Sequence, residues 1–511
     1  MNTKLRLPLV LVGTLLFHFL FWKEDMGLNV ILHFLFSTVV YALLYRDSFQ
    51  NRSFQIALSG TFVLASAVVI HQSAMSQVVY WISAILTLGF AHATGIRTVL
   101  YASLRAGRDF IYVPYELIML FRPKGDMGPK MNKLIWIIKI AIIPGILTMI
   151  FLAIYSNSNE VFGNYVDGFF NKVEEIIEMF IQKFGLAQFL FFIFGALMSG
   201  WFIQSTIRSH YQEKESKRKR YLEPHPIMEK IPSDSENRDR RLGKYINENA
   251  SGSLLMIMIN LMLVVLNMID ITHYWFDFDS AGVNLTQFVH EGTYLLILSI
   301  LLSMALMLYY FRGYQNFSPN HKRLSLLAYV WIIQNSILVI SVGIRNLHYI
   351  QHHALAYKRI GVFFFLLAVL FGLFTLYKKI AEKRTGFYLL NLNSWSIYIV
   401  FVIVGAINWD GFITRYNISK VPTIALDEDF LLNMSDKTLP LLLEHKHLFE
   451  EEKINRLYYR IHNFLREKSD VSWLSWNFAE DKAVGYFQKN PIPQVIDYEG
   501  RSYDPDLYLH E

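Results

Sequence analysis

The stretch Gly252–Phe276 has the sequence GSLLMIMINLMLVVLNMIDITHYWF and contains no Lys or Arg. A helix needs roughly 20 apolar residues to cross the hydrocarbon core of a bilayer, so this stretch is long enough. Comparable apolar runs recur along the first 407 residues, and they do not alternate as the strands of a membrane barrel would. The sequence therefore predicts an all-α fold, a polytopic bundle of transmembrane helices.

Outward from this stretch, about eleven runs are predicted to cross a membrane. The expected spans are 7–22, 28–45, 54–70, 78–96, 133–155, 186–207, 252–276, 288–311, 324–343, 359–377 and 389–407. The composition agrees, because 53% of the 511 residues are hydrophobic and only 18% are charged, which is too apolar for an ordinary soluble chain. The lipid bilayer is therefore the expected partner of the chain.

Lys and Arg gather in alternate loops, and this pattern predicts the orientation because positively charged short loops stay in the cytoplasm. The N-terminus belongs to the basic set through Lys4 and Arg6, whereas loop 71–77 is uncharged and loop 156–185 is acidic overall. Eleven crossings from a cytoplasmic N-terminus place everything after Asn408 on the outer side.

The chain divides into four predicted regions. They are 1–207 with about six spans and an outer interfacial helix near 165–184, the basic cytoplasmic loop 208–251, 252–407 with about five spans, and a soluble helical tail over 408–511. In the tail, apolar residues recur every three or four positions from Ile454 to Leu465, as in an amphipathic helix. That stripe must be covered, either by the rest of the tail or by the membrane helices.

Two regions are expected to meet partners. The basic segment 208–244 contains Lys217–Arg220 and shows no apolar periodicity. It either stays solvated and only fixes the topology, or contacts anionic lipid or a protein, since basic residues beside a membrane are attracted to anionic headgroups. The tail 408–511 offers a surface to a protein partner. No nucleic-acid partner is expected.

Several short motifs lie in the second half of the chain. They are Leu285–Gly292, Arg345–Tyr349, Tyr357–Arg359, Asn408–Asp410, Arg415–Asn417, Leu426–Asp427, Phe430–Leu431, Ser435–Asp436 and Leu439–Pro440. On these stretches, over about 250–445, the chain resembles a bacterial family of polytopic membrane proteins classed as a domain of unknown function, number 4173. The family-like positions are Asn408, Asp410, Arg415, Tyr416, Asn417 and Asp427. The resemblance implies a multi-pass protein of the bacterial cytoplasmic (inner) membrane and transfers no catalytic residue.

Ionisable residues inside predicted spans are costly and therefore mark a candidate site. The expected cluster, at the outer ends of four successive spans, consists of Asp270, His273, His290, Glu291, Arg345 and Arg359. It would serve ion coupling or bind an anionic ligand. Alternatively, its charges pair only to fix the register of the helices.

Other chemistry is not predicted. The chain has no Cys, which excludes disulfides and thiolate sites. His348, His352 and His353 lie close in sequence without a nearby carboxylate, so no metal or cofactor is expected. His18, His33 and His92 stand alone in apolar spans, and we expect them to hydrogen-bond across helices. No catalytic motif is present.

Three functional hypotheses remain. The first is a non-enzymatic membrane scaffold or sensor, favoured by the long basic loop and the separate tail. The second is a secondary transporter that uses Asp270 and Glu291. A membrane enzyme ranks last because no catalytic constellation can be named.

Overall fold

The structure is a computed structural model and describes most of the chain. The described residues are 5–120, 129–180, 185–204, 210–222, 235–275, 285–312, 316–317, 321–421, 424–469, 471–493, 495–496 and 502–503. Within them, the side chains of 129–139, 142–143, 146, 174–180, 210, 235–246, 274, 285–296, 495–496 and 502–503 lie outside the description. Nineteen α-helices make up nearly all of this part. The all-α fold class is confirmed.

The first group of helices comes from the N-terminal part of the chain. It consists of α1 (Arg6–Phe21), α2 (Leu28–Leu44), α3 (Arg52–His71), α4 (Ala74–Ala91), α5 (Val99–Leu120) and α8 (Leu186–Ile203). A short 3-10 helix, Arg46–Gln50, joins α2 to α3. The side chains of Asn51 and Ser73 accept hydrogen bonds from backbone N–H groups at the starts of α3 and α4, as N-cap residues do. These caps fix where the two helices begin.

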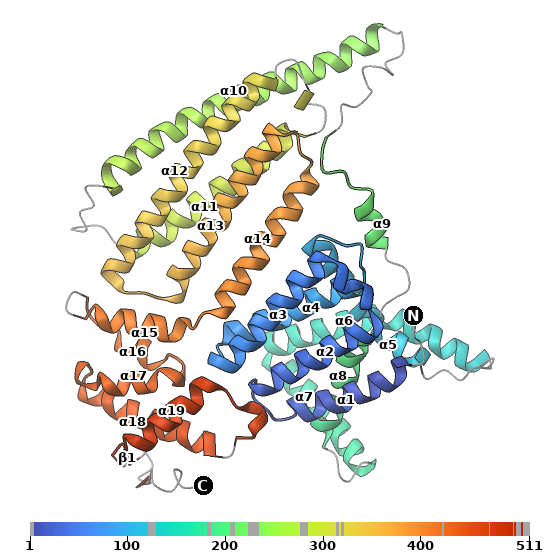
Figure 1. The fold of residues 1–511 in the computed structure, drawn as a ribbon, viewed down its shortest axis with the longest axis vertical. Helices are drawn as coiled ribbons and strands as arrows, with labels where there is room; N and C mark the ends of the chain where they lie inside the picture. Colours follow the sequence, from blue (N-terminus) through green and yellow to red (C-terminus); the bar gives the residue numbers. More distant parts are fainter. Residues whose placement is uncertain are drawn as a thin grey trace.

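The second group of helices lies beside the first (Figure 1). It consists of α10 (Ser235–Asp270), a π-helical turn (Ile271–Trp275), α11 (Leu285–Tyr310), α12 (His321–His353) and α13 (Tyr357–Ala381). Helix α14 (Gly386–Ala406) contacts α13 and also α3, α4 and α5 of the first group. Its Tyr398 hydroxyl bonds Ser83 Oγ at 2.7 Å, and Thr61 Oγ1 lies 2.7 Å from the same serine oxygen. These hydroxyls join the two groups in an apolar interior.

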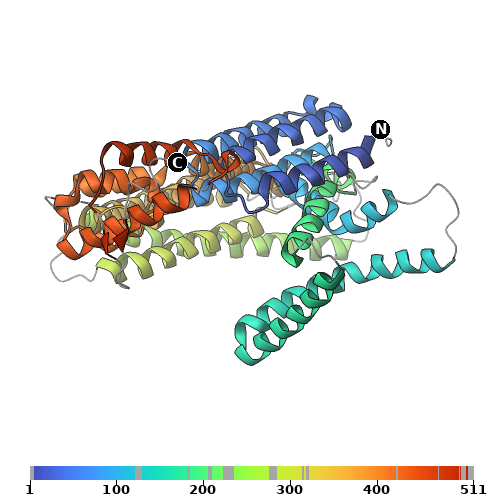
Figure 2. The ribbon, with the colours of Figure 1, turned by 90° about the horizontal axis from the view of Figure 1, so that it is seen from below.

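Helices α6 (Pro129–Ser158) and α7 (Glu160–Phe180) form an arm that contacts few other helices. Figure 2 shows the arm extending to one side of the remaining helices. Large apolar side chains of both helices, among them Phe151, Ile154 and Phe169, are exposed. Helix α7 overlaps the predicted interfacial helix near 165–184. The short α9 (His210–Ser216) follows α8.

The tail packs onto one end of α12 and α13 (Figure 1). Its α-helices are α15 (Trp409–Ser419), α16 (Glu428–Leu432), α17 (Leu439–Glu444), α18 (Glu451–Ser469) and α19 (Phe478–Lys489). Short 3-10 helices lie at Asp436–Thr438, Lys446–Leu448 and Trp473–Ser475. The strands β1 (Val495–Ile496) and β2 (Ser502–Tyr503) pair in antiparallel orientation. The predicted amphipathic helix is α18, and its Leu457 and Ile461 are fully buried. Ile350 and Ile360 belong to the same apolar core. Helices α12 and α13 therefore help to cover the stripe.

The two ends of the helix bundle differ in what they contact. We call the end covered by the tail the tail end and the opposite end, where Arg220 and Arg384 lie, the basic end. At the tail end, residues of the tail bond the α1–α2 and α3–α4 turns: Leu28 N donates to Trp476 O at 3.0 Å, and Asn477 Nδ2 to Gln72 Oε1 at 3.1 Å. At the basic end, Thr385 N donates to Arg220 O at 3.0 Å. The α1–α2 and α3–α4 turns thus lie at the end of the bundle away from the contact between Arg220 and Thr385.

Among the described residues, seven helices are long and apolar enough to cross a membrane. They are Arg52–His71, Ala74–Ala91, Leu186–Ile203, Asn247–His273, His321–His353, Tyr357–Ala381 and Gly386–Ala406. Four shorter apolar helices, Arg6–Phe21, Leu28–Leu44, Leu147–Ser158 and Ile297–Tyr310, overlap the remaining predicted spans.

Two segments differ from the sequence prediction. Between Arg97 and Lys133 the sequence predicts an inner loop with one short apolar segment, Phe110–Phe121, that lies along the inner surface or re-enters. The structure has α5 there, with Pro114 inside the helix, and the apolar face of α5 packs against α4 and α8. The predicted loop 208–251 is helical over α9 and again from Ser235 onward, where α10 begins well before its apolar part. Neither α5 nor the start of α10 forms an apolar run of membrane length, yet both are helical, because a helix needs only part of its surface to be apolar.

The contact of α4 with α5 gives the first testable prediction. A Cβ atom added at Gly89 would overlap the backbone carbonyl of Ala102, so the helices would have to separate. We expect Gly89→Ala to lower the free energy of unfolding by about 1–3 kcal/mol. Gly107→Ala on the open side of α5 meets nothing within 4 Å and should not destabilise. Thermal unfolding of the detergent-solubilised protein measures both variants. Equal unfolding midpoints for Gly89→Ala and Gly107→Ala would contradict the close approach of α4 to α5.

Candidate functional site

A cavity of about 640 Å³ lies at the tail end, where the two helix groups meet the tail. Four segments supply its walls: the α3–α4 turn, the start of α13, the α14–α15 junction and the tail segment before α17. Small-molecule sites in proteins have this size and favour junctions of this kind. We call this space the outer cavity.

The α3–α4 turn and the tail are joined at the rim of the outer cavity. Gln72 ends α3 in a left-handed conformation with φ of 42°, which turns its carbonyl away from the helix. Lys437 Nζ donates a 2.5 Å hydrogen bond to that carbonyl oxygen. Burial lowers the pKa of the Lys437 ammonium, although the nearby Asp410 carboxylate opposes the shift. This contact, between residues 365 positions apart, fastens the tail over the cavity.

The lining of the outer cavity includes a buried carboxylate. Asp410, on the first turn of α15, is only 7% exposed. Tyr357, at the start of α13, donates from its hydroxyl to Asp410 Oδ1 at 2.6 Å. Buried carboxylates need such partners, because an unpaired charge in a low-dielectric site is costly. The bond links α13 to the α14–α15 junction.

The lining combines an acid, a base, neutral polar groups and an apolar wall. Besides Asp410 and Lys437, its polar members are Gln72, Ser73, Gln77, Tyr357, Asn433 and Ser435. Ile360, Phe364, Val404 and Trp409 make the apolar side. Such a mixture can orient a small polar molecule that carries both charge signs, since each charged end finds an opposite partner.

The family-like motif positions have separable structural roles. Asn408 and Asp427 are N-caps, accepting from Gly411 N at 3.1 Å and from Phe430 N at 3.0 Å. Asn417 bonds the α12–α13 turn in both directions: its Oδ1 accepts from Leu355 N at 2.7 Å, and its Nδ2 donates to Leu355 O at 3.0 Å. Of these positions, only Asp410 lines the outer cavity.

The other two motif positions lie on α15 beside Asn417. Tyr416 packs against the tail core, and Arg415 is exposed. Neither residue is among those that line the outer cavity.

Within the predicted ionisable cluster, Asp270 and Arg345 form a buried ion pair between α10 and α12. Their side chains are 1% and 7% exposed. The pair ends a polar seam along the two helices, in which Gln334 Nε2 donates to Asn260 Oδ1 at 2.8 Å and Asn267 Nδ2 to Gln334 O at 3.1 Å. Hydrogen bonds of this kind hold helices together inside membranes.

The remaining cluster members lie elsewhere or outside the description. His273 is exposed and bonds Ile269 O at 3.2 Å within its own turn. The π-helical turn that starts at Ile271 explains this, because its wider spacing rotates His273 off the face of Asp270. Arg359 Nη1 donates to His353 O at 2.5 Å and thus closes the α12–α13 turn. The side chains of His290 and Glu291, on α11, lie outside the description.

The isolated histidines hydrogen-bond between helices, as predicted. His33 Nδ1 lies 2.9 Å from Tyr80 Oη, and His18 Nε2 lies 3.3 Å from Gln188 Nε2. His92 Nδ1 lies 2.8 Å from Asp109 Oδ2, which also accepts from Arg105 Nε at 2.9 Å. Among the described residues, no group of three or more His, Asp or Glu side chains is placed to hold a metal ion.

Sequence reasoning missed Gln72, Tyr357 and Lys437 as cavity residues, and it missed the Arg105–Asp109 pair. The four-residue spacing of Arg105 and Asp109 was a readable signal for an ion pair on a helix. Nothing local marks Lys437, because its partner is a backbone carbonyl in a distant turn.

Comparison with known protein families shows a match over most of the chain. The model of the family described as Domain of unknown function (DUF4153) matches residues 8–445. The resemblance to the family numbered 4173 was therefore wrong, and the match extends through the N-terminal helices, which had shown no motif. Short polar motifs between apolar helices are insufficient to separate these two families. Neither a curated protein nor a solved structure matches the chain.

Proposed function

Since this chain belongs to the family described as a domain of unknown function (DUF4153), whose description assigns no activity, we propose a role from its own geometry. The chain is a non-enzymatic membrane sensor. Its tail closes over the outer cavity and responds to a small polar ligand there. The observation that carries this proposal is that both helix groups and the tail build the cavity jointly. A ligand that contacts all three can change how the tail is held.

The proposed topology has eleven crossings, a cytoplasmic N-terminus and an outer tail, in the cytoplasmic membrane of a bacterium. The separation of the tail end from the basic end supports it, because Arg220, Arg312 and Arg384 lie at the end away from the tail. Positively charged ends stay in the cytoplasm. The apolar arm of α6 and α7 faces lipid in this arrangement.

A thiol-labelling experiment tests the proposal that the tail closes over the outer cavity. The native chain has no Cys, so only the introduced thiol can react. Ser73→Cys places a thiol in the outer cavity, whereas Arg415→Cys places one on the exposed face of α15. With a membrane-impermeant maleimide added to intact cells, we expect the thiol at 415 to react readily and the thiol at 73 to react slowly. Adding Lys437→Met should speed labelling at 73 by about tenfold, because a charge-assisted hydrogen bond that holds the tail is lost.

The outcomes separate the proposals. If neither thiol reacts from outside, the topology is wrong. If Ser73→Cys reacts as fast as Arg415→Cys, or if Lys437→Met leaves its rate unchanged, the tail does not gate the cavity and the sensor proposal fails.

A secondary transporter is the second candidate, and the α10–α12 seam is the observation that favours it. Asp270 is fully buried, and its Oδ2 has no hydrogen-bond partner among the described residues. The π-helical turn that follows it is a feature often found at functional sites. A transporter must admit water to this seam, so Asn267→Cys should then react with a small maleimide. In the sensor, that thiol should stay unreactive.

A further inference from the structure

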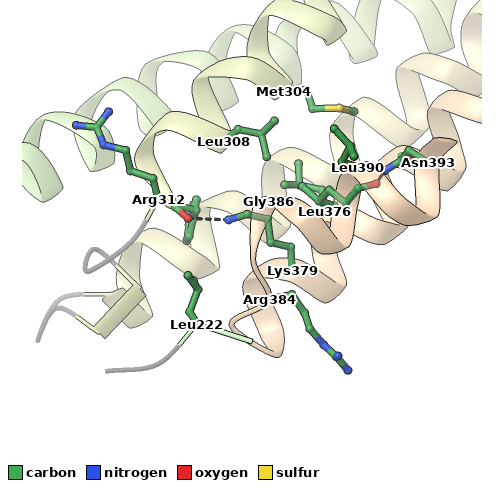
Figure 3. A pocket seen from close by; sticks show the side chains of 13 residues that line it. Leu222, Met304, Leu308, Arg312, Leu376, Lys379, Arg384, Gly386, Leu390 and Asn393 are labelled. Carbon is green, nitrogen blue, oxygen red and sulfur yellow. Dashed lines mark hydrogen bonds between the residues drawn. The ribbon is translucent and has the colours of Figure 1, made fainter. Parts of the chain in front are cut away.

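A second cavity, of about 510 Å³, lies at the basic end between α11, α13 and α14 (Figure 3). Its walls are mainly apolar and include Met304, Leu308, Leu376, Leu389 and Leu390. Its basic members are Arg312, Lys379 and Arg384. We call this space the inner cavity. It shares no lining residue with the outer cavity.

Lys379 is the unusual group in the inner cavity. The residue is 3% exposed, and Nζ donates to the backbone oxygen of Phe311 at 2.6 Å, as drawn in Figure 3. No ion pair joins Lys379 to a carboxylate in the part of the chain that is described. A neutral carbonyl at the end of α11 offsets only part of a buried positive charge. An anion in the cavity would complete the compensation.

The two arginines at the rim differ from Lys379, because each already has a carboxylate. Arg312 pairs with Glu248 at 2.9 Å, and Arg384 pairs with Glu382 at 2.6 Å. Arg384 also stacks over Tyr221 at 3.8 Å, and Leu222 closes one wall of the cavity. These ion pairs hold both guanidinium groups in place at the rim of the cavity.

We propose that the inner cavity binds a phosphate-bearing amphiphile. Its phosphate pairs with Lys379, and its acyl chain lies along Met304, Leu308 and Leu390. A phosphate without a chain would leave the apolar wall exposed to water, which is unfavourable. The position at the proposed cytoplasmic end suits an anionic lipid of the inner leaflet. The proposed site is a defined cavity between α11, α13 and α14, which differs from a diffuse attraction of lipid to the basic segment 208–244.

Native mass spectrometry of the full chain in detergent tests the proposal. The probes are phosphatidylglycerol, phosphatidylcholine with the same acyl chains, and inorganic phosphate. We expect one copy of phosphatidylglycerol to bind about tenfold more tightly than phosphatidylcholine, since only the first is anionic overall. Lys379→Met should abolish this preference. Lys378→Met, which removes a partly exposed neighbouring charge paired with Glu382 at 3.0 Å, should keep the preference.

A second variant guards against misfolding of Lys379→Met. Leu390 lines the inner cavity and is 39% exposed, so Leu390→Trp fills the space while it leaves Lys379 in place. It should also lose the bound lipid. The proposal is overturned if Leu390→Trp binds phosphatidylglycerol as tightly as the parent protein does. It is also overturned if Lys378→Met loses as much of the preference for phosphatidylglycerol as Lys379→Met. Full displacement of phosphatidylglycerol by an equal concentration of inorganic phosphate would show that the site binds a free anion. That result would overturn the proposal of a lipid ligand.

Discussion

Replacing Asp270 by Asn should lower the free energy of unfolding by about 3–5 kcal/mol, because it removes one partner of a buried ion pair. Arg345 would keep its charge at 7% exposure, without the carboxylate that now faces it. In a low-dielectric interior the unmatched charge of Arg345 raises the free energy of the folded state, whereas at a surface water would screen that charge. Unfolding of the purified protein, followed by tryptophan fluorescence, measures the loss.

Two controls make this result specific to the buried pair. Asp429→Asn removes an exposed carboxylate from Lys453 and should change the unfolding free energy little, because surface pairs contribute little. The double variant Asp270→Leu with Arg345→Leu removes both charges and should recover most of the loss. Equal effects of Asp270→Asn and Asp429→Asn would show that water reaches the pair, as a transporter would require.

Asp109 gives the second large effect, in the first helix group. Asp109→Leu should cost about 3–5 kcal/mol, because Arg105 then loses the carboxylate bonded to its Nε in a site where both side chains are 1% exposed. His92 loses its bond as well, so the α4–α5 contact weakens. The expected readout is a lower unfolding midpoint with an unchanged helical signal at low temperature.

Two control variants are matched to Asp109→Leu: one changes its partner on α5, and the other changes an exposed carboxylate near the basic end of the bundle. Arg105→Met combined with Asp109→Leu replaces the pair by apolar side chains and should restore much of the stability. Asp47→Asn, at an exposed position near the basic end, should have little effect. If the double variant is no more stable than Asp109→Leu alone, the carboxylate acts through groups other than Arg105.

The sequence by itself determined the helical class, the places where apolar helices lie and the stripe of α18. These are local properties, because the length of an apolar run and its period suffice to define them. The caps are local too, as Asn51, Ser73 and Asn408 show, each bonding a backbone group within three residues.

Only the tertiary structure decided which distant groups meet. Asp270 pairs with Arg345, 75 residues away, while Arg359 turns back to its own loop. One π-helical turn was enough to move His273 off the predicted face. Lys437 meets Gln72 across 365 residues, and the outer cavity exists only because the tail folds back onto both helix groups. Such pairings depend on helix rotation and packing in three dimensions, which no local pattern encodes.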